Sequence, residues 1–176
     1  MTAAATRILL IGAAGRMGQT LARLLAGGSF PGLALAAAVD RPDSPLIGQD
    51  AGSAAGAQAL GVKISGDLDA ALAAGAAVAV DFSFHAASAA AATKMAAAGV
   101  PWIVGTTGLD EAEKAAIAAA ARKIPVVLAA NMSVGVNLLY ALVEQAARAL
   151  KGRGYDCEII ERHHRRKKDA PSGTAL

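Results

Sequence analysis

A short basic segment near the end of the chain contains most of the side chains suited to chemistry. Residues 162–168 include two histidines and five arginines or lysines. A histidine can donate or accept a proton near neutral pH, and a lysine can do so when its surroundings lower its pKa. Clustered cations followed by the N–H groups of a helix start can hold an anion. The segment is therefore a candidate anion-binding and proton-transfer site, although a solvated basic loop or a nucleic-acid patch has the same pattern.

Regular structure is predicted on both sides of this segment. Residues 155–162 have the composition of a short strand, in which Cys157 would be buried. Ser172 has the side chain of a helix N-cap. The basic segment is thus expected to be a strand-to-helix loop.

The overall composition indicates a globular protein with a local site. The chain has 176 residues, of which 55% are hydrophobic and 18% charged, and its formal net charge is +3. Residues 162–168 supply much of that charge, which favours an anion site over a nucleic-acid-binding surface. The single cysteine excludes an internal disulfide and a Cys-rich zinc site, and we predict no metal. No apolar run reaches the roughly 18 residues of a membrane helix, so we expect a cytoplasmic protein that binds neither membrane nor nucleic acid.

The beginning of the chain has the pattern of a dinucleotide-binding turn. A continuous run of strand-forming residues at 7–11 predicts a strand buried on both faces, and it leads into Gly12, Gly15 and Gly18 and then a helical pattern. The first glycine would allow a tight turn, the second would let the backbone approach a pyrophosphate, and the third would let helix and strand pack closely. The glycines alone also fit an ordinary structural turn.

An acidic residue after the second predicted strand strengthens this interpretation. The strand at residues 33–39 ends at Asp40, about 20 residues beyond the glycines, where a carboxylate can bind ribose hydroxyls. Asp40 would repel a 2′-phosphate, whereas Arg41 could attract one. We therefore expect NADH or NADPH, or both, as the cofactor, with a preference for NADH.

Strands and helices alternate through the middle of the chain. Strands are predicted at 62–64, 76–82, 102–104 and 125–129, with helices at 68–74, 86–98 and 110–123. Asp67 and Asp110 are predicted to be the N-caps of the first and last of these helices. This alternation predicts a Rossmann-like, doubly wound parallel sheet of the α/β class. Ligands bind at the carboxyl ends of such strands, where residues 105–108 and 129–132 fall. We interpret His85, near another strand end, as a helix-start residue rather than a catalyst.

The pattern changes at about residue 131, where we place a domain boundary. Residues 1–130 would be the dinucleotide-binding domain, and residues 131–176 the start of a second, α+β domain for substrate binding and tetramerisation. Residues 134–150 predict a long amphipathic helix. Because a lone strand needs partners, we expect this second domain to be incomplete at Leu176.

Four blocks of the sequence resemble the 4-hydroxy-tetrahydrodipicolinate reductase (dihydrodipicolinate reductase) family. They are residues 12–18, 105–108, 131–137 and 158–175, the last of which combines H-H-x-x-K with D-A-P-S-G-T. The resemblance implies an NAD(P)H-dependent oxidoreductase of lysine/diaminopimelate biosynthesis that reduces 4-hydroxy-tetrahydrodipicolinate to tetrahydrodipicolinate. It also implies a small dicarboxylate substrate, a homotetramer at full length, and a chain truncated at its C-terminus, which would bind nucleotide even if it lacked turnover.

The resemblance implies a role for individual residues. His163 would be the proton donor, Lys167 the second catalytic group, and His164, Gly173 and Thr174 would hold the substrate carboxylates. The cofactor would be lined by Gly12, Ala13, Ala14, Gly15, Arg16, Met17, Asp40, Arg41, Gly105, Thr106, Thr107, Ala129, Ala130, Asn131 and Met132.

Three other functions stay open from the residues alone. Another two-domain nicotinamide-dependent amino-acid dehydrogenase would share the first domain but not the last block. A non-catalytic dinucleotide-binding module would need only the glycine turn and Asp40. A nucleic-acid-binding module would use the basic loop, but aromatic residues make up only 3% of the chain, too few for a base-stacking platform.

Overall fold

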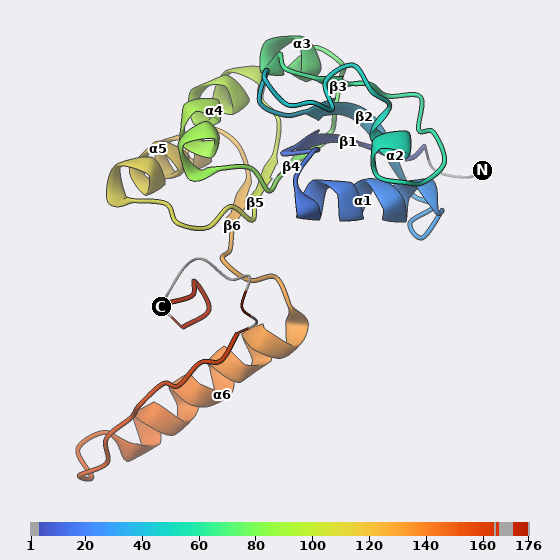
Figure 1. Cartoon of the computed structure of the whole chain (residues 1–176). Helices are drawn as coiled ribbons and strands as arrows, with labels where there is room; N and C mark the ends of the chain where they lie inside the picture. Colours follow the sequence, from blue (N-terminus) through green and yellow to red (C-terminus); the bar gives the residue numbers. More distant parts are fainter. Residues whose placement is uncertain (1–3, 164, 166–170, 176) are drawn as a thin grey trace. The chain divides into compact units, whose positions relative to one another are not determined.

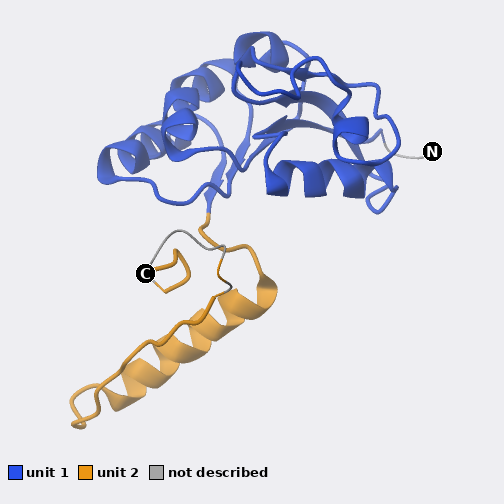
Figure 2. Ribbon diagram, in the orientation of Figure 1, with its two compact units in different colours: residues 1–128 blue, residues 129–176 orange. Residues whose placement is uncertain are grey.

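The chain folds into two compact units, residues 1–128 and residues 129–176 (Figure 2). A computed structural model describes residues 4–163, 165 and 171–175. The first unit is built on a six-stranded, fully parallel sheet with the strand order β3-β2-β1-β4-β5-β6. The strands are β1 (Thr6–Ile11), β2 (Leu33–Val39), β3 (Ile64–Ser65), β4 (Val78–Asp81), β5 (Trp102–Val104) and β6 (Val126–Leu128). The predicted Rossmann-like, doubly wound α/β fold is confirmed.

Helices cover both faces of this sheet (Figure 1). The helices of the chain are α1 (Arg16–Ala26), α2 (Ala51–Ala54), α3 (Leu68–Leu72), α4 (His85–Ala98), α5 (Glu111–Ala121) and α6 (Val134–Leu150). Two predicted N-caps are confirmed, since the Asp67 carboxylate accepts hydrogen bonds from two N–H groups at the start of α3, and Asp110 forms a capping box with Glu113 in α5.

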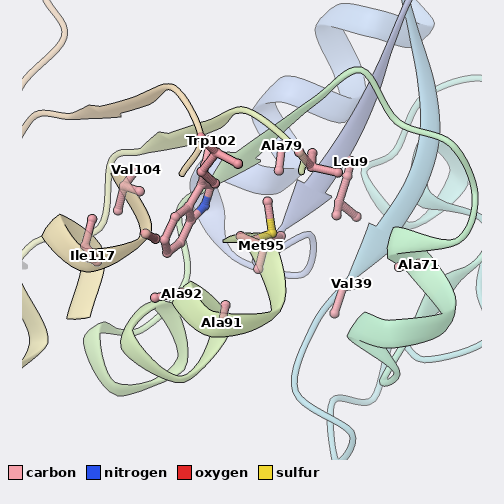
Figure 3. Close-up of a cluster of buried hydrophobic side chains, with 14 of the residues drawn as sticks. Leu9, Val39, Ala71, Ala79, Ala91, Ala92, Met95, Trp102, Val104 and Ile117 are labelled. Atoms are coloured by element: carbon pink, nitrogen blue, oxygen red, sulfur yellow. The ribbon is translucent and has the colours of Figure 1, made fainter. Parts of the chain in front are cut away.

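Apolar side chains of the central strands point alternately to two separate cores. Leu9 and Ile11 of β1 pack into the core under α3, α4 and α5, whereas Leu10 packs into the core under α1 and α2. Trp102 is the largest fully buried side chain of the first core, which also contains Leu9 and Met95 (Figure 3). Burial on both faces explains why β1 is continuously apolar and why its strand could be predicted from sequence.

Backbone contacts at two glycines close the connection between β1 and α1. Gly12 has a φ of +81°, a conformation that favours glycine. A Cβ on Gly18 would lie 2.1 Å from the carbonyl oxygen of Gly12, so no side chain fits there. The tight turn and the close helix–strand packing predicted for these two glycines are both confirmed.

The predicted strand and helix at the end of the chain are wrong within the described residues. Residues 155–163 form no strand, and Cys157 is exposed rather than buried. An extended segment becomes a strand only when a neighbour pairs with its backbone, and none of the described residues does so here. Ser172 starts a turn over residues 173–175, where the amide N of Ala175 is 3.2 Å from the Ser172 hydroxyl.

Gly18→Ala tests the close packing of α1 on β1. The new methyl group meets backbone rather than a movable side chain, so we expect the free energy of unfolding to fall by about 1–3 kcal/mol. Urea unfolding followed by the fluorescence of the single tryptophan, Trp102, measures this loss. Gly32→Ala is the matched control, because a Cβ there meets nothing within 4 Å. Equal stability of the two variants would contradict the packing argument.

Candidate dinucleotide site

The carboxyl ends of four adjacent strands meet where the strand order reverses between β1 and β4. The amide N atoms of Gly12 and Ala13 lie 2.9 Å and 3.0 Å from the carbonyl oxygen of Val39, which ties the glycine turn to β2. The amide N of Phe82 lies 3.1 Å from the Ile11 oxygen, and that of Gly105 lies 2.9 Å from the Asp81 oxygen. Such a reversal point is where open α/β sheets bind ligands.

A cavity of about 670 Å³ opens at these strand ends, entirely within the first unit. Its floor is the glycine turn, including Gly12, Ala14 and Gly15. The end of β2 and the following loop contribute one wall, and the segment Phe82–Phe84 with the first part of α4 contributes another. The other lining residues are Ile11, Val39, Asp40, Arg41, Pro42, Ser44, Pro45, Leu46, Leu68, Ala87 and Ala91. Its mostly apolar lining with a few polar groups is typical of a cofactor site.

Asp40 joins the glycine turn to the wall of the cavity. Its Oδ2 atom accepts a hydrogen bond of 2.7 Å from the amide N of Ala14, and its Oδ1 atom accepts one of 2.9 Å from the amide N of Arg41. A carboxylate held in this way keeps lone pairs for further donors such as ribose hydroxyls. The start of α1 follows the same turn, and the first N–H groups of a helix have no partner within it, which suits a pyrophosphate.

Arg41 forms an ion pair with Asp43 at the rim, with 3.3 Å between Nε and Oδ1. Both side chains are more than two-thirds exposed, so water weakens the pair. The guanidinium can therefore turn towards a bound phosphate at little cost.

Several predicted cofactor residues do not line this cavity. Arg16 and Met17 are exposed at the start of α1, and Ala13 is buried in the core beneath it. Thr106 is 5% exposed, with its hydroxyl directed to other side chains, whereas Thr107 of the same loop is exposed. Within the Gly105–Gly108 loop, the surfaces open to a ligand are thus Thr107 and backbone.

The sequence predicted a strand end here, but no site residue was assigned to the segment Phe82–Phe84 or to the buried group that precedes it. Asp81, the last residue of β4, is fully buried. Its Oδ1 atom accepts hydrogen bonds from the amide N of Ser83 at 2.9 Å and from the Thr106 hydroxyl at 3.3 Å. The Ser88 hydroxyl donates to the Thr106 hydroxyl at 2.9 Å and lies 3.2 Å from the Ser83 hydroxyl. We call Asp81, Ser83, Ser88 and Thr106 the Asp81 cluster.

Burial raises the pKa of the Asp81 carboxyl, although the hydrogen bonds from Ser83, Ser88 and Thr106 oppose that rise. No described residue gives a hydrogen-bond partner to its Oδ2 atom. An unpartnered buried polar group costs about 1–3 kcal/mol. The signal for this group in the sequence was an aspartate at the end of an apolar strand.

Asp50, in the loop beyond β2, has the opposite environment. Its carboxylate accepts hydrogen bonds from the amide N atoms of Gly52, Ser53, Leu60 and Val62. Backbone hydrogen bonds, chiefly from Ser53 and then Leu60, lower the pKa of this carboxyl. Asp50 therefore ties together the two ends of the segment from residue 50 to residue 62.

The second unit brings several of the predicted substrate-site residues together. The Glu161 carboxylate accepts a hydrogen bond of 2.9 Å from the amide N of Ser172 and another from the Ser172 hydroxyl. The Oε2 atom of Glu161 lies 3.4 Å from His163 Nδ1. Glu161 therefore links the predicted proton donor to the turn that contains Gly173 and Thr174.

Asn131 reaches the same turn from the other end of the second unit. Its side-chain N lies 3.0 Å from the Thr174 hydroxyl, and the Tyr140 hydroxyl donates to the Thr174 carbonyl oxygen at 3.2 Å. The neighbouring Ala129, Ala130 and Met132 belong to the same segment. His164 and Lys167 lie outside the described residues.

Two features are absent from the described part of the chain, a metal-binding cluster and a membrane-spanning helix. No group of three or more histidine, cysteine, aspartate or glutamate side chains is placed there to bind a metal ion. Over the same residues, no helix combines the length and the apolar character needed to cross a membrane.

Comparison with known proteins identifies the family. A family model described as "Dihydrodipicolinate reductase, N-terminus" matches residues 6–132, and one described as "Dihydrodipicolinate reductase, C-terminus" matches residues 135–176. The chain belongs to the dihydrodipicolinate reductase family. This confirms the resemblance inferred from the glycine turn and the basic block.

Curated relatives agree with this membership. The 4-hydroxy-tetrahydrodipicolinate reductase of Anaeromyxobacter dehalogenans is 54% identical over 171 residues, which cover 97% of this chain and 62% of the relative. That of Thiobacillus denitrificans is 55% identical over 170 residues, with the same shares covered. The chain thus spans 62% of the length of these dihydrodipicolinate reductases.

Solved structures agree on the fold. A dipicolinate-bound dihydrodipicolinate reductase from Paenisporosarcina sp. TG-14 has a TM-score of 0.67 at 22% identity, covering 97% of this chain and 63% of that one. GenD2 from gentamicin A biosynthesis, in complex with NAD, has a TM-score of 0.55 at 22% identity and covers 87% of this chain and 41% of that one. At such identities the likeness shows the fold alone.

The two perturbed aspartates predict opposite dependences of stability on pH. Because the pKa of Asp81 is raised on folding, the folded protein binds more protons at this carboxyl than the unfolded chain does at pH values above about 3.9, the ordinary pKa of an aspartate. The contribution of Asp81 to the free energy of unfolding therefore falls as the pH rises above that value. Asp50 contributes stability above that pH and loses it as pH falls through its lowered folded pKa.

The aspartate-to-asparagine variants at these two positions measure the effect. From pH 4 to pH 7, wild type should lose stability relative to Asp81→Asn. From pH 5 down to pH 3, wild type should lose stability relative to Asp50→Asn. Urea unfolding of both variants across this range measures the slopes, and parallel lines for the two pairs would refute the assigned environments.

Proposed function

We propose that this chain carries the dinucleotide-binding half and part of the substrate-binding half of an NAD(P)H-dependent 4-hydroxy-tetrahydrodipicolinate reductase of lysine/diaminopimelate biosynthesis. The observation that supports this most is the succession of the two family matches, over residues 6–132 and 135–176, on a chain whose first unit has a cavity at the sheet's reversal point. The net reaction converts 4-hydroxy-tetrahydrodipicolinate, NAD(P)H and a proton into tetrahydrodipicolinate, NAD(P)⁺ and water.

The proposed cofactor residues fall into three groups by position. Gly12, Ala14 and Gly15, together with the start of α1, receive the pyrophosphate. Asp40 accepts the adenosine ribose hydroxyls, and Arg41 attracts a 2′-phosphate when NADPH is bound. Thr107 and the backbone of residues 105–107, together with residues 129–132, are proposed for the nicotinamide side. When bound, the dihydronicotinamide supplies the hydride.

In the second unit, His163 is proposed to deliver the proton and Lys167 to assist it. Hydride addition to a conjugated imine leaves negative charge that a nearby acid must neutralise. The Glu161 carboxylate, whose Oε2 atom lies 3.4 Å from Nδ1, supports this role for His163, because a carboxylate beside one ring nitrogen can fix the orientation of the imidazole. His164, Gly173 and Thr174 are proposed to bind the substrate carboxylates, using cationic and backbone N–H donors.

We also propose a homotetramer at the length of the relatives, a cytoplasmic location, and no nucleic-acid or membrane partner. The family membership supports these assignments. Light scattering on a chain of the same length as the relatives measures its molar mass and so tests the homotetramer directly.

Asp40→Ala tests the cofactor site. We expect the Kd for NADH to rise about 10- to 100-fold, the loss expected when hydrogen bonds to a charged acceptor disappear. Asp40→Asn should lose less affinity for NADPH than for NADH, because it removes the repulsion of a 2′-phosphate.

NADH fluorescence titration measures these affinities. Asp69→Asn, which removes an exposed carboxylate paired with Lys94, is the control and should leave the Kd within about twofold. An unchanged Kd in Asp40→Ala would exclude the proposed ribose contact.

His163→Ala tests the proton donor in the protein at its gene-encoded length. Loss of a general acid should lower kcat about 10²- to 10⁴-fold and leave the Kd for NADH unchanged. Steady-state assays with freshly generated substrate, with NADH and NADPH in turn, measure the rate. His85→Ala removes an imidazole bonded to Glu113 and is the control, with kcat changed only a few-fold. A protein that binds NADH but reduces no substrate even as wild type would instead support the non-catalytic dinucleotide-binding module.

A further inference from the structure

We propose that Asp81 is a positioning residue that holds the turn between β4 and α4 against two glycine loops, the Gly12–Gly15 turn of the dinucleotide cavity and the neighbouring Gly105–Gly108 loop. The proposal rests on the proposed cofactor function, because it assigns Asp81 a role in the affinity for NAD(P)H. Asp81 does not line the cavity itself. It acts through residues that do.

The Asp81 carboxylate shapes the turn directly. Its Oδ1 atom accepts from the amide N of Ser83, two residues later, which is the hydrogen bond of an Asx turn. The turn leads to Phe84, the N-cap of α4, which has no side-chain capping bond of its own. The hydrogen bond from Ser83 to Asp81 is therefore the local interaction that sets how the chain leaves β4.

The same oxygen ties this turn to the loop after β5. The Thr106 hydroxyl donates to it at 3.3 Å and accepts from the Ser88 hydroxyl at 2.9 Å. Both side chains of that pair are buried, so neither bond competes with water. We infer that the hydroxyl of Thr106 anchors its loop rather than contacting the cofactor.

Phe82, the central residue of the turn, touches both glycine loops. A Cβ on Gly12 would lie 2.6 Å from the Phe82 carbonyl oxygen. A Cβ on Gly105 would lie 2.1 Å from the Phe82 ring. A displacement of this turn must therefore displace the floor of the cavity, the loop after β5, or both.

The burial of Asp81 argues that this residue does more than fill space at the end of β4. An apolar side chain of similar size would pack at this strand end without an unpartnered Oδ2 atom and without a carboxyl whose pKa burial raises. Costly buried polar groups beside a ligand cavity are typical of functional sites. The specific gain here is the simultaneous orientation of Ser83 and Thr106.

Threonine 106 offers the sharpest test. Thr106→Val keeps the shape of the side chain but removes the hydroxyl, and we expect the Kd for NADH to rise about fivefold to tenfold. Thr106→Ser keeps the hydroxyl and should stay within about twofold of wild type. Asp81→Ala should raise the Kd at least as much as Thr106→Val, and the double variant should be no worse than Asp81→Ala alone because both act through one cluster. All Kd values come from NADH fluorescence titration of the 176-residue chain at a temperature where each variant is folded.

Ile117→Val is the control for general loss of stability. Ile117 is buried in the core between α5 and the sheet. It takes no part in the hydrogen bonds of the Asp81 cluster. It should lower the unfolding midpoint without changing the Kd. Equal Kd values for Thr106→Val and Thr106→Ser, or a rise in Kd that simply follows stability across all variants including Ile117→Val, would overturn the proposal.

The wild-type titration separates the two levels of inference. If wild type binds neither NADH nor NADPH, the proposed cofactor function fails and the role of Asp81 fails with it. If wild type binds and Thr106→Val binds equally well, the cofactor site stands and only the positioning role is wrong.

Discussion

The first unit depends on one steric constraint, the passage of the β1–α1 turn between the ends of β2 and β4. The carbonyl oxygen of Val39 accepts hydrogen bonds from one side, and that of Phe82 lies where a side chain on Gly12 would have to be. At Gly18, α1 approaches this turn so closely that a Cβ on residue 18 would collide with the carbonyl oxygen of Gly12. Because backbone rather than side chain fills this space, the helix start and the cavity floor are placed together.

Two aspartates lie at the carboxyl ends of β2 and β4, the strands on either side of β1, and their environments differ. Asp40 is partly exposed and accepts hydrogen bonds from backbone N–H groups, so its oxygens keep lone pairs for a ligand. Asp81 is fully buried, which disfavours its charge, and its hydrogen bonds run inward to Ser83 and Thr106. The first is suited to contacting a nucleotide and the second to holding the loops that do.

In the second unit, the apolar side chains of α6 and of the segment that follows it are not buried by the described residues. None of the residues of α6 is buried, and Ile160 is 86% exposed. Its order comes instead from polar links, in which Glu161 binds Ser172 and Asn131 binds Thr174. Those links connect residues of two of the sequence blocks that resemble the reductase family, 131–137 and 158–175.

The sequence by itself determined the features that depend on local pattern. Alternating apolar runs and helix caps predicted the sheet and its helices, and the order of glycines and Asp40 predicted the cavity floor, because strand ends of a parallel sheet must share an edge. The predicted strand at residues 155–162 failed because a strand depends on partners as well as composition. Only the tertiary structure decided that Phe82–Phe84 lines the cavity and that Thr106 turns inward to Asp81, 25 residues away. The hydrophobic pattern of the sequence cannot predict this contact between side chains, because the contact forms only when β4 and β5 pair.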